Sequence, residues 1–270
     1  MNRRPLLPAL LPGLLFAVAL LTGASLPGCA APPSPQTAGE AARIAGLMPA
    51  DAILLGEQHD APAHQRLHRE VIRLLAERGQ LAAVAVEMAE RGASTADLKR
   101  SAGEDLVQST LRWNESAWPW RAYGPSVMAA VRAGVPVMGA NLPRAAMRDA
   151  MANASLDGQL PGPALKAQQQ AIRNGHCQLL PESQIQPMTR IQIARDQAMA
   201  ATLVQARVPG KAVVLLAGAG HVDASLGVPQ HLPKDFESRS EALAGSDAPV
   251  KDHCEELRKQ MSGPTVPPQK

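Results

Sequence analysis

The stretch that decides the fold is Ala52-Ile53-Leu54-Leu55-Gly56-Glu57-Gln58-His59-Asp60, an apolar run followed at once by polar side chains. A short apolar run that ends on glycine is typical of a buried strand. Pro62 follows, and apolar residues then recur at helical spacing up to Gly79. The pattern predicts a strand–loop–helix unit with Glu57 and His59 at the carboxyl end of its strand, where open α/β sheets bind ligands.

A second strand end of the same kind lies far downstream, in Ala212-Val-Val-Leu-Leu-Ala-Gly-Ala-Gly-His221. Apolar runs at 81–88 and 135–141 predict two further strands, and long helical patterns separate all four. Buried strands separated by helices indicate an α/β fold: a mainly parallel sheet flanked by helices on both faces, with added helical segments. Because parallel strands end at a common edge, we expect the polar residues that close them to meet there: Glu57, His59, Glu87, Asn141 and His221.

Such a set is compatible with a metal site, an acid–base catalytic pair or the polar rim of a cofactor pocket. Each member also has a structural interpretation. Glu57 can cap the following helix, Asn141 can hold a turn, and Glu87 can form a buried ion pair with Arg91, Arg144 or Arg195. His64 and His68, four residues apart on one helix, can be hydrogen-bonded core histidines. Tyr123, the only tyrosine, is either a buried hydroxyl near the site or a cofactor ligand.

Composition narrows the classes of function. The 270 residues are 46% hydrophobic, enough for one globular domain, while aromatic residues make up only 2%. The formal charge of +3 falls to +1 without Arg3 and Arg4. This small net charge does not indicate a nucleic-acid-binding protein. No dinucleotide fingerprint, P-loop, Gly-x-Ser-x-Gly elbow or pair of cysteines at zinc spacing is present.

The N-terminus predicts export. Two arginines precede a proline-broken apolar stretch, and Leu26-Pro27-Gly28-Cys29 resembles a lipobox. We expect residues 1–28 to be a lipoprotein signal peptide, Cys29 to be acylated and residues 29–39 to be a tether. Ordinary cleavage at a small-residue site and an uncleaved membrane anchor are the alternatives. The expected location is the bacterial cell envelope, on the periplasmic side of the outer membrane.

The remaining sequence is predicted to form an α/β domain over residues 40–240 and a partly disordered C-terminal segment over 241–270. Cys177 and Cys254 are an even pair in an oxidising compartment. A disulfide that ties the C-terminal segment to the domain is compatible with this pairing, and so are two free thiols.

Several short motifs, taken together and in order, resemble the ChaN-like haem-binding lipoproteins. They are Leu-Leu-Gly-Glu-Gln-His-Asp at 54–60, Glu87-Met88, Trp120 with Tyr123, the run 136–144, Arg-Asp-Gln-Ala-Met-Ala at 195–200 and Ala-Gly-Ala-Gly-His-Val at 217–222. The resemblance extends over about 52–229. That family is grouped with erythromycin esterases and Tiki/TraB proteins. The resemblance implies an α/β fold, lipid anchoring, haem binding, a part in iron uptake, an outer-membrane haem receptor as partner and a homodimer around haem.

Carried onto this chain, the family's Gly-Glu-x-His motif falls on 56–59, its second Gly-x-x-His motif on 218–221 and its acidic residue on Glu87. The resemblance makes Tyr123 the favoured ligand of ferric haem iron through its phenolate, with His59, His64 and His221 as rivals. Glu87 and Asn141 complete the predicted cofactor pocket. The alternative is a hydrolase with Glu57, His59, Glu87 and His221 as its site, in which His59 or a divalent metal activates water while Glu57 or Glu87 carries the proton. The resemblance favours a binding protein over an enzyme. The third hypothesis is a scaffold protein with no ligand.

Overall fold

The computed structural model describes residues 32–245 and 253–261. The predicted signal peptide, the predicted lipidation site Cys29 and the first residues of the predicted tether lie outside this range. The remainder belongs to one compact unit that begins at Pro33.

A five-stranded sheet of parallel strands forms the centre of this unit, in the order β3-β2-β4-β1-β5. The strands are listed with their bounds: β1 Ala52–Glu57, β2 Leu81–Glu90, β3 Val137–Asn141, β4 Ala212–Gly218 and β5 Ser238–Ala242. The predicted α/β architecture is confirmed. β5 was not predicted, because it is an edge strand with β1 as its only strand neighbour, and its Ser-Arg-Ser-Glu-Ala sequence lacks an apolar face. It also crosses the predicted end of the domain at residue 240.

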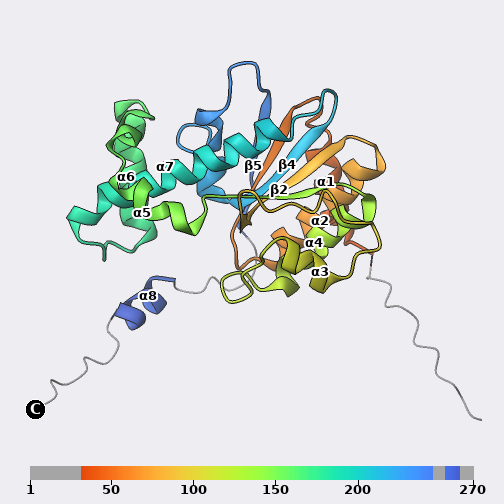
Figure 1. The fold of residues 1–270 in the computed structure, drawn as a ribbon, viewed down its shortest axis with the longest axis horizontal. Coiled ribbons are helices and arrows are strands. Elements are labelled where there is room, and N and C mark those ends of the chain that lie inside the picture. The colour runs from red at the N-terminus through yellow and green to blue at the C-terminus, as the bar shows by residue number, and fades with distance from the viewer. Residues whose placement is uncertain (1–31, 246–252, 262–270) are drawn as a thin grey trace, which may run out of the picture. The chain divides into compact units, whose positions relative to one another are not determined.

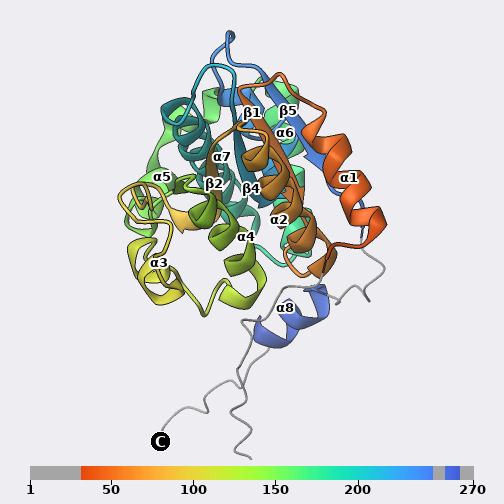
Figure 2. The ribbon, with the colours of Figure 1, turned by 90° about the vertical axis from the view of Figure 1, so that its right-hand side faces the viewer.

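Eight α-helices within the described residues surround the sheet. They are α1 Pro35–Ala45, α2 Pro62–Glu77, α3 Glu104–Thr110, α4 Trp120–Ala133, α5 Met147–Ala152, α6 Gly162–Gly175, α7 Glu182–Gln205 and α8 His253–Met261. Figure 1 shows α7 on one side of the strands and α1, α2 and α4 on the other. Turned by 90°, Figure 2 shows α2 and α4 in front of the strands.

The helix α1 begins inside the segment predicted as a tether. The Ser34 hydroxyl accepts the Thr37 N–H, and Pro35 occupies the first turn, where its missing N–H costs no hydrogen bond. Ala41 and Ile44 then lie buried in the core. Residues 35–39 are therefore the first turns of the domain, not part of a linker.

Alternate residues of each strand enter two separate cores. Ile53, Val84 and Leu216 point to the face covered by α2 and α4. Leu54 and Leu215 point to the opposite face, against Met199 and Leu203 of α7. The period of two is the ordinary alternation of side chains along a strand, and burial on both faces explains why these strands are continuously apolar in sequence.

The strand order creates a switch point at β4. The path from β1 through β2 to β3 runs in one direction across the sheet, and α2 and α4 cover one face. The return from β3 to β4 reverses this direction, and α7 covers the other face. β4 lies between β2 and β1. The segments that follow β1 and β2 cover one face of the sheet, whereas the segment that follows β4 packs on the other face. Ligands of open α/β sheets bind at such a point.

Two observations complete the fold. Cys177, at the turn between α6 and α7, forms a disulfide with Cys254 of α8. Among the described residues, no helix combines the length and apolar character needed to cross a membrane.

Candidate functional site

The carboxyl ends of β1, β2 and β4 bring four of the predicted residues together. Glu57 is paired in register with Gly218, three residues before His221. Glu87 lies between the two histidines: its Oε2 is 3.8 Å from His59 Nε2, and its Oε1 is 3.4 Å from His221 Nε2. Two segments that are more than 150 residues apart in sequence therefore form one site.

The site extends beyond the predicted residues to Asp196 of α7. Its Oδ1 is 2.5 Å from His221 Nδ1, and the Gln192 amide lies 3.1 Å from the same nitrogen. We did not predict Asp196 as a site residue. A signal was present, since Asp196 shares a helix face with Met199 and Leu203 and is thus an acid on a core-facing stripe.

The His221 part of the site is a buried cation between two carboxylates. Burial alone lowers the pKa of His221, but the charges of Glu87 and Asp196 outweigh burial and raise it to about 10. Burial likewise opposes ionisation of Glu87, yet His221 and the Gly218 N–H hold the pKa of Glu87 at about 2. Both ring nitrogens of His221 therefore carry protons at neutral pH, and this state contradicts its prediction as an iron ligand.

The His59 part of the site is open to solvent on one side, with 41% of the His59 side chain exposed. Its Nδ1–H donates to Glu57 Oε1 over 2.8 Å, and its ring lies edge-on to Trp118 with 4.8 Å between centroids. Burial lowers the pKa of His59, but the hydrogen bond to Glu57 and the charge of Glu87 together outweigh it, and the net shift is upward. With Nδ1 bound to Glu57, the neutral ring keeps the Nε2 lone pair available.

Tyr123 does not fit the role of iron ligand. Its side chain is buried, and its hydroxyl donates to Glu57 Oε1 over 2.6 Å. Burial first, and then the neighbouring charge of Glu57, raise the pKa of Tyr123 far above its usual value. The structure therefore contradicts the prediction of a phenolate ligand, because Tyr123 remains a phenol that positions Glu57.

His64 also has another role. Its Nδ1 accepts the Gln58 N–H over 3.0 Å, and its Nε2–H donates to the Ala244 carbonyl over 2.6 Å. No lone pair of the ring is left for iron, contrary to its prediction as a rival ligand. His68 is fully buried 3.5 Å from Glu57 Oε2, and burial lowers the pKa of His68 to about 4, so it is a neutral core residue.

A cleft of about 340 Å³ adjoins the strand ends. Its lining includes Glu87, Trp118, Asn141, Leu142 and Met147, together with three arginines at 112, 144 and 195. Asn141 donates from Nδ2 to the Glu87 carbonyl over 2.9 Å, while its Oδ1 is buried without a hydrogen-bond partner. The predicted alternative of a Glu87–arginine ion pair is wrong, because the groups that lie beside the Glu87 carboxylate are the imidazoles of His221 and His59.

The predicted residues do not form an all-protein metal site. Within residues 32–245 and 253–261, no group of three or more His, Cys, Asp or Glu side chains is arranged to hold a metal ion. The site instead offers one partly exposed imidazole, that of His59.

A family model described as "Haem-binding uptake, Tiki superfamily, ChaN" matches residues 43–232, more than half of the chain. The chain belongs to this family. It is also similar to a solved ChaN from Campylobacter jejuni, described by its cofacial heme binding. The two share 23% sequence identity and a TM-score of 0.65, over 77% of this chain and 87% of that one. At this identity, the likeness shows a common fold. No curated protein matches the chain.

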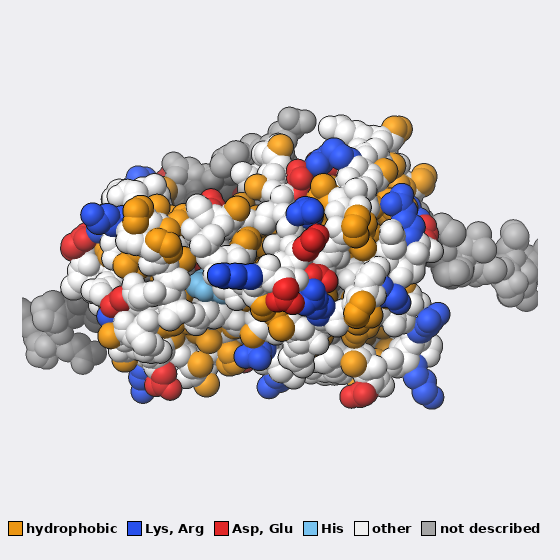
Figure 3. Space-filling model, turned by 90° about the horizontal axis from the view of Figure 1, so that it is seen from above, with side chains coloured by type: hydrophobic (Ala, Val, Ile, Leu, Met, Phe, Trp, Pro, Cys, Tyr) orange, Lys and Arg blue, Asp and Glu red, His pale blue; other side chains and the backbone are white. Residues whose placement is uncertain are grey.

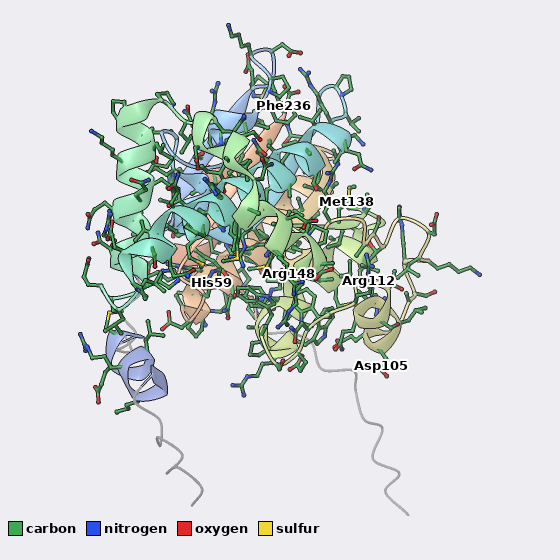
Figure 4. The ribbon with its side chains drawn as sticks, turned by 60° about the vertical axis from the view of Figure 1, so that its left-hand side comes forward. His59, Asp105, Arg112, Met138, Arg148 and Phe236 are labelled. Carbon is green, nitrogen blue, oxygen red and sulfur yellow. A yellow bond between two sulfur atoms is a disulfide. The ribbon has the colours of Figure 1, made fainter. Side chains whose placement is uncertain are left out.

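Within this ChaN-family fold, the accessible His59, the buried His221 and the cleft lie around the ends of β1, β2 and β4. Figure 4 labels His59 and Arg112, which lie at the same level in that view with Arg148 between them.

Proposed function

We propose that this ChaN-family chain binds haem and that His59 supplies the axial nitrogen. The observation that carries the proposal is the Glu57–His59 pair: a buried carboxylate fixes Nδ1–H of a side chain that is 41% exposed, while Nε2 lies 3.8 Å from Glu87 Oε2 and makes no hydrogen bond to the described residues. Histidines that bind metals almost always donate their other N–H to such a partner, which orients the ring and raises its basicity.

The residues around His59 fit a haem. A bound haem supplies an iron with axial positions that accept an imidazole nitrogen. Trp118 lies against the His59 ring and also lines the cleft, so one apolar surface joins the ligand to the cavity. Tyr123 donates a hydrogen bond that holds Glu57 in place, and the neutral His68 lies beside it. The low aromatic content leaves Trp118, Leu142 and Met147 as the apolar walls.

The proposal extends to the biological setting. The family name supports a part in haem and iron uptake, and the lipobox-like sequence ending at Cys29 supports anchoring in the cell envelope on the periplasmic side of the outer membrane. A homodimer around haem and an outer-membrane haem receptor are the partners that we propose.

Titration of the purified protein with hemin tests the haem proposal. We expect a shifted Soret band with the wild type and at least about a tenfold loss of affinity in His59→Ala. The matched control is His176→Ala, which removes a partly exposed histidine at the end of α6. An affinity for hemin that is the same in His59→Ala as in the wild type would contradict the proposal.

The same pair also supports a second candidate, hydrolysis with His59 as general base. In this function, His59 Nε2 would take a proton from water, and Glu57 would stabilise the resulting imidazolium. A screen with chromogenic esters distinguishes the two functions: turnover that is lost in His59→Ala supports hydrolysis, and its absence in the wild type removes this candidate.

A further inference from the structure

We propose that Arg112, Arg144 and Arg195 form a carboxylate clamp that recognises the two propionate groups of a porphyrin, with or without iron. This inference deepens the proposed haem function by naming the part of the ligand that the cleft selects. It concerns a separate part of the site from His59.

The three arginines come from distant parts of the chain. Arg112 follows α3, Arg144 begins the 3-10 turn after β3, and Arg195 lies in α7. All three line the same cleft. Their convergence results from the tertiary fold rather than from a local run of basic residues.

None of the ion pairs found among the described residues involves any of these three guanidinium groups. Two carboxylates also line the cleft, but each already has partners. Glu87 accepts the Gly218 N–H and lies beside His221, and Glu90 accepts the Arg144 backbone N–H. With Glu87 beside His221, the three guanidinium groups outnumber Glu90, the remaining carboxylate of the lining, so an anionic ligand would be favoured there.

One residue of the cleft carries a buried donor with no partner. Arg195 Nε is buried without a hydrogen-bond partner, although such atoms are normally satisfied. Arg112 has a backbone φ of 50°, a conformation that is uncommon outside glycine and clusters at ligand-binding positions.

The chemistry of the lining defines the ligand class. Guanidinium groups bind carboxylates through two parallel N–H···O bonds, a geometry that lysine does not reproduce. Trp118, Leu142 and Met147 supply an apolar wall in the same cleft. A planar apolar molecule with two carboxylates matches both features, and a porphyrin dicarboxylate is such a molecule.

Binding of metal-free protoporphyrin IX tests the clamp without iron ligation, because this porphyrin has both propionates and no iron. We expect the double variant Arg112→Gln/Arg144→Gln to bind protoporphyrin IX and hemin at least about tenfold more weakly than the wild type. The matched control is Arg66→Gln/Arg121→Gln, which removes two exposed arginines from a different hollow, between α2 and α4. Both substituted arginines of the clamp are exposed. Unchanged thermal unfolding then shows that the fold is intact.

Protoporphyrin IX dimethyl ester provides the second arm, because it lacks free carboxylates. The wild type should bind the ester more weakly than the free acid, and the double variant should remove this preference. An equal affinity of wild type and double variant for protoporphyrin IX would overturn the clamp. His59→Ala, in contrast, should lower the affinity for hemin but not the affinity for protoporphyrin IX. A failure of the iron-ligand proposal and a failure of the clamp proposal therefore give different results.

Discussion

The two Gly-x-x-His motifs end neighbouring strands of one sheet but place their histidines in opposite surroundings. His221 is 6% exposed and lies between Glu87 and Asp196. The His59 side chain is 41% exposed and has Glu57 as its one close carboxylate partner, with Glu87 at 3.8 Å. The same motif therefore produces a buried cation in one place and a partly exposed imidazole in the other.

The difference comes from what covers each strand end. α7 packs over the end of β4 and delivers Asp196 and Gln192 to His221. The loop after β1 instead lies at the rim, where Trp118 covers only one edge of His59. A local motif specifies where a histidine lies along the chain, whereas the covering elements decide how many of its nitrogens remain free.

The largest expected effect is the loss of stability in His221→Ala. Removal of this cation leaves Glu87 and Asp196 buried without compensation, and breaking such a pair costs about 3–5 kcal/mol. His59→Ala removes a partly exposed hydrogen bond, which costs roughly 1 kcal/mol. Urea unfolding of both variants measures the difference. Equal losses would show that the two histidines are equivalent.

The glycines of the two motifs should also differ. A Cβ at Gly56 would lie 2.3 Å from Val222 Cγ2 and 2.9 Å from Ala219 Cα, so Gly56→Ala should cost about 1–3 kcal/mol. A Cβ at Gly218 would meet chiefly the His59 ring, at 2.9 Å from Nε2, and that ring can move outward. We expect Gly218→Ala to retain stability in urea and to weaken hemin binding. A larger loss of stability in Gly218→Ala than in Gly56→Ala would contradict the close packing of Gly56 against Val222 and Ala219.

Stability should fall as pH rises above 6.5. The pKa of His221 is raised to about 10, so its contribution is fully present below 6.5 and is lost as pH rises toward 10. On the acidic side two groups oppose each other: the pKa of His68, lowered to about 4, favours the folded state as pH rises from 4 to 6.5, whereas burial raises the pKa of Asp196 to about 6 and favours the folded state as pH falls. Each slope is at most about 1.4 kcal/mol per pH unit.

Urea midpoints between pH 4 and 10 measure both slopes. His68→Leu should remove the His68 contribution, so that stability no longer gains from this group between pH 4 and 6.5, and should leave the alkaline side unchanged. A stability that remains constant from pH 6.5 to 10 would contradict the buried imidazolium at His221.

A small effect on stability, and none on hemin binding, is expected from Tyr123→Phe. It removes the hydroxyl that donates to Glu57 and leaves the ring in place, at a cost of roughly 1 kcal/mol. Hemin should still bind with an unchanged Soret position, because Glu57 and His59 stay paired. A Soret shift in this variant would restore Tyr123 as an iron ligand.

Much of the fold could be predicted because burial on both faces leaves a continuous apolar run at each inner strand. The meeting of Glu57, His59, Glu87 and His221 followed from parallel strands sharing an edge. β5 could not be predicted, since an edge strand needs no apolar face. The role of Asp196 could not be assigned without the three-dimensional placement of α7. Whether the polar atoms of Tyr123, His64 and His221 already have hydrogen-bond partners depends on residues up to 180 positions away in sequence.

Surface charge was predictable only in outline. Figure 3 shows acidic and basic side chains interspersed on the face seen from above, in keeping with a nearly balanced sequence. The three arginines of the cleft do not stand out in sequence, because they are separated by 32 or more residues and come together only through the tertiary fold.

The small side chains under α7 have a consequence for a distant atom. On that face β2 presents Ala83 and Ala85, whereas its other face presents the larger Val84 and Val86. Short methyl groups let a helix approach a sheet closely, and a short aspartate at position 196 can then reach the imidazole of His221. A valine in place of Ala83 or Ala85 would widen this spacing and move the Asp196 carboxylate away from His221. The small size of these two alanines therefore helps to keep His221 protonated.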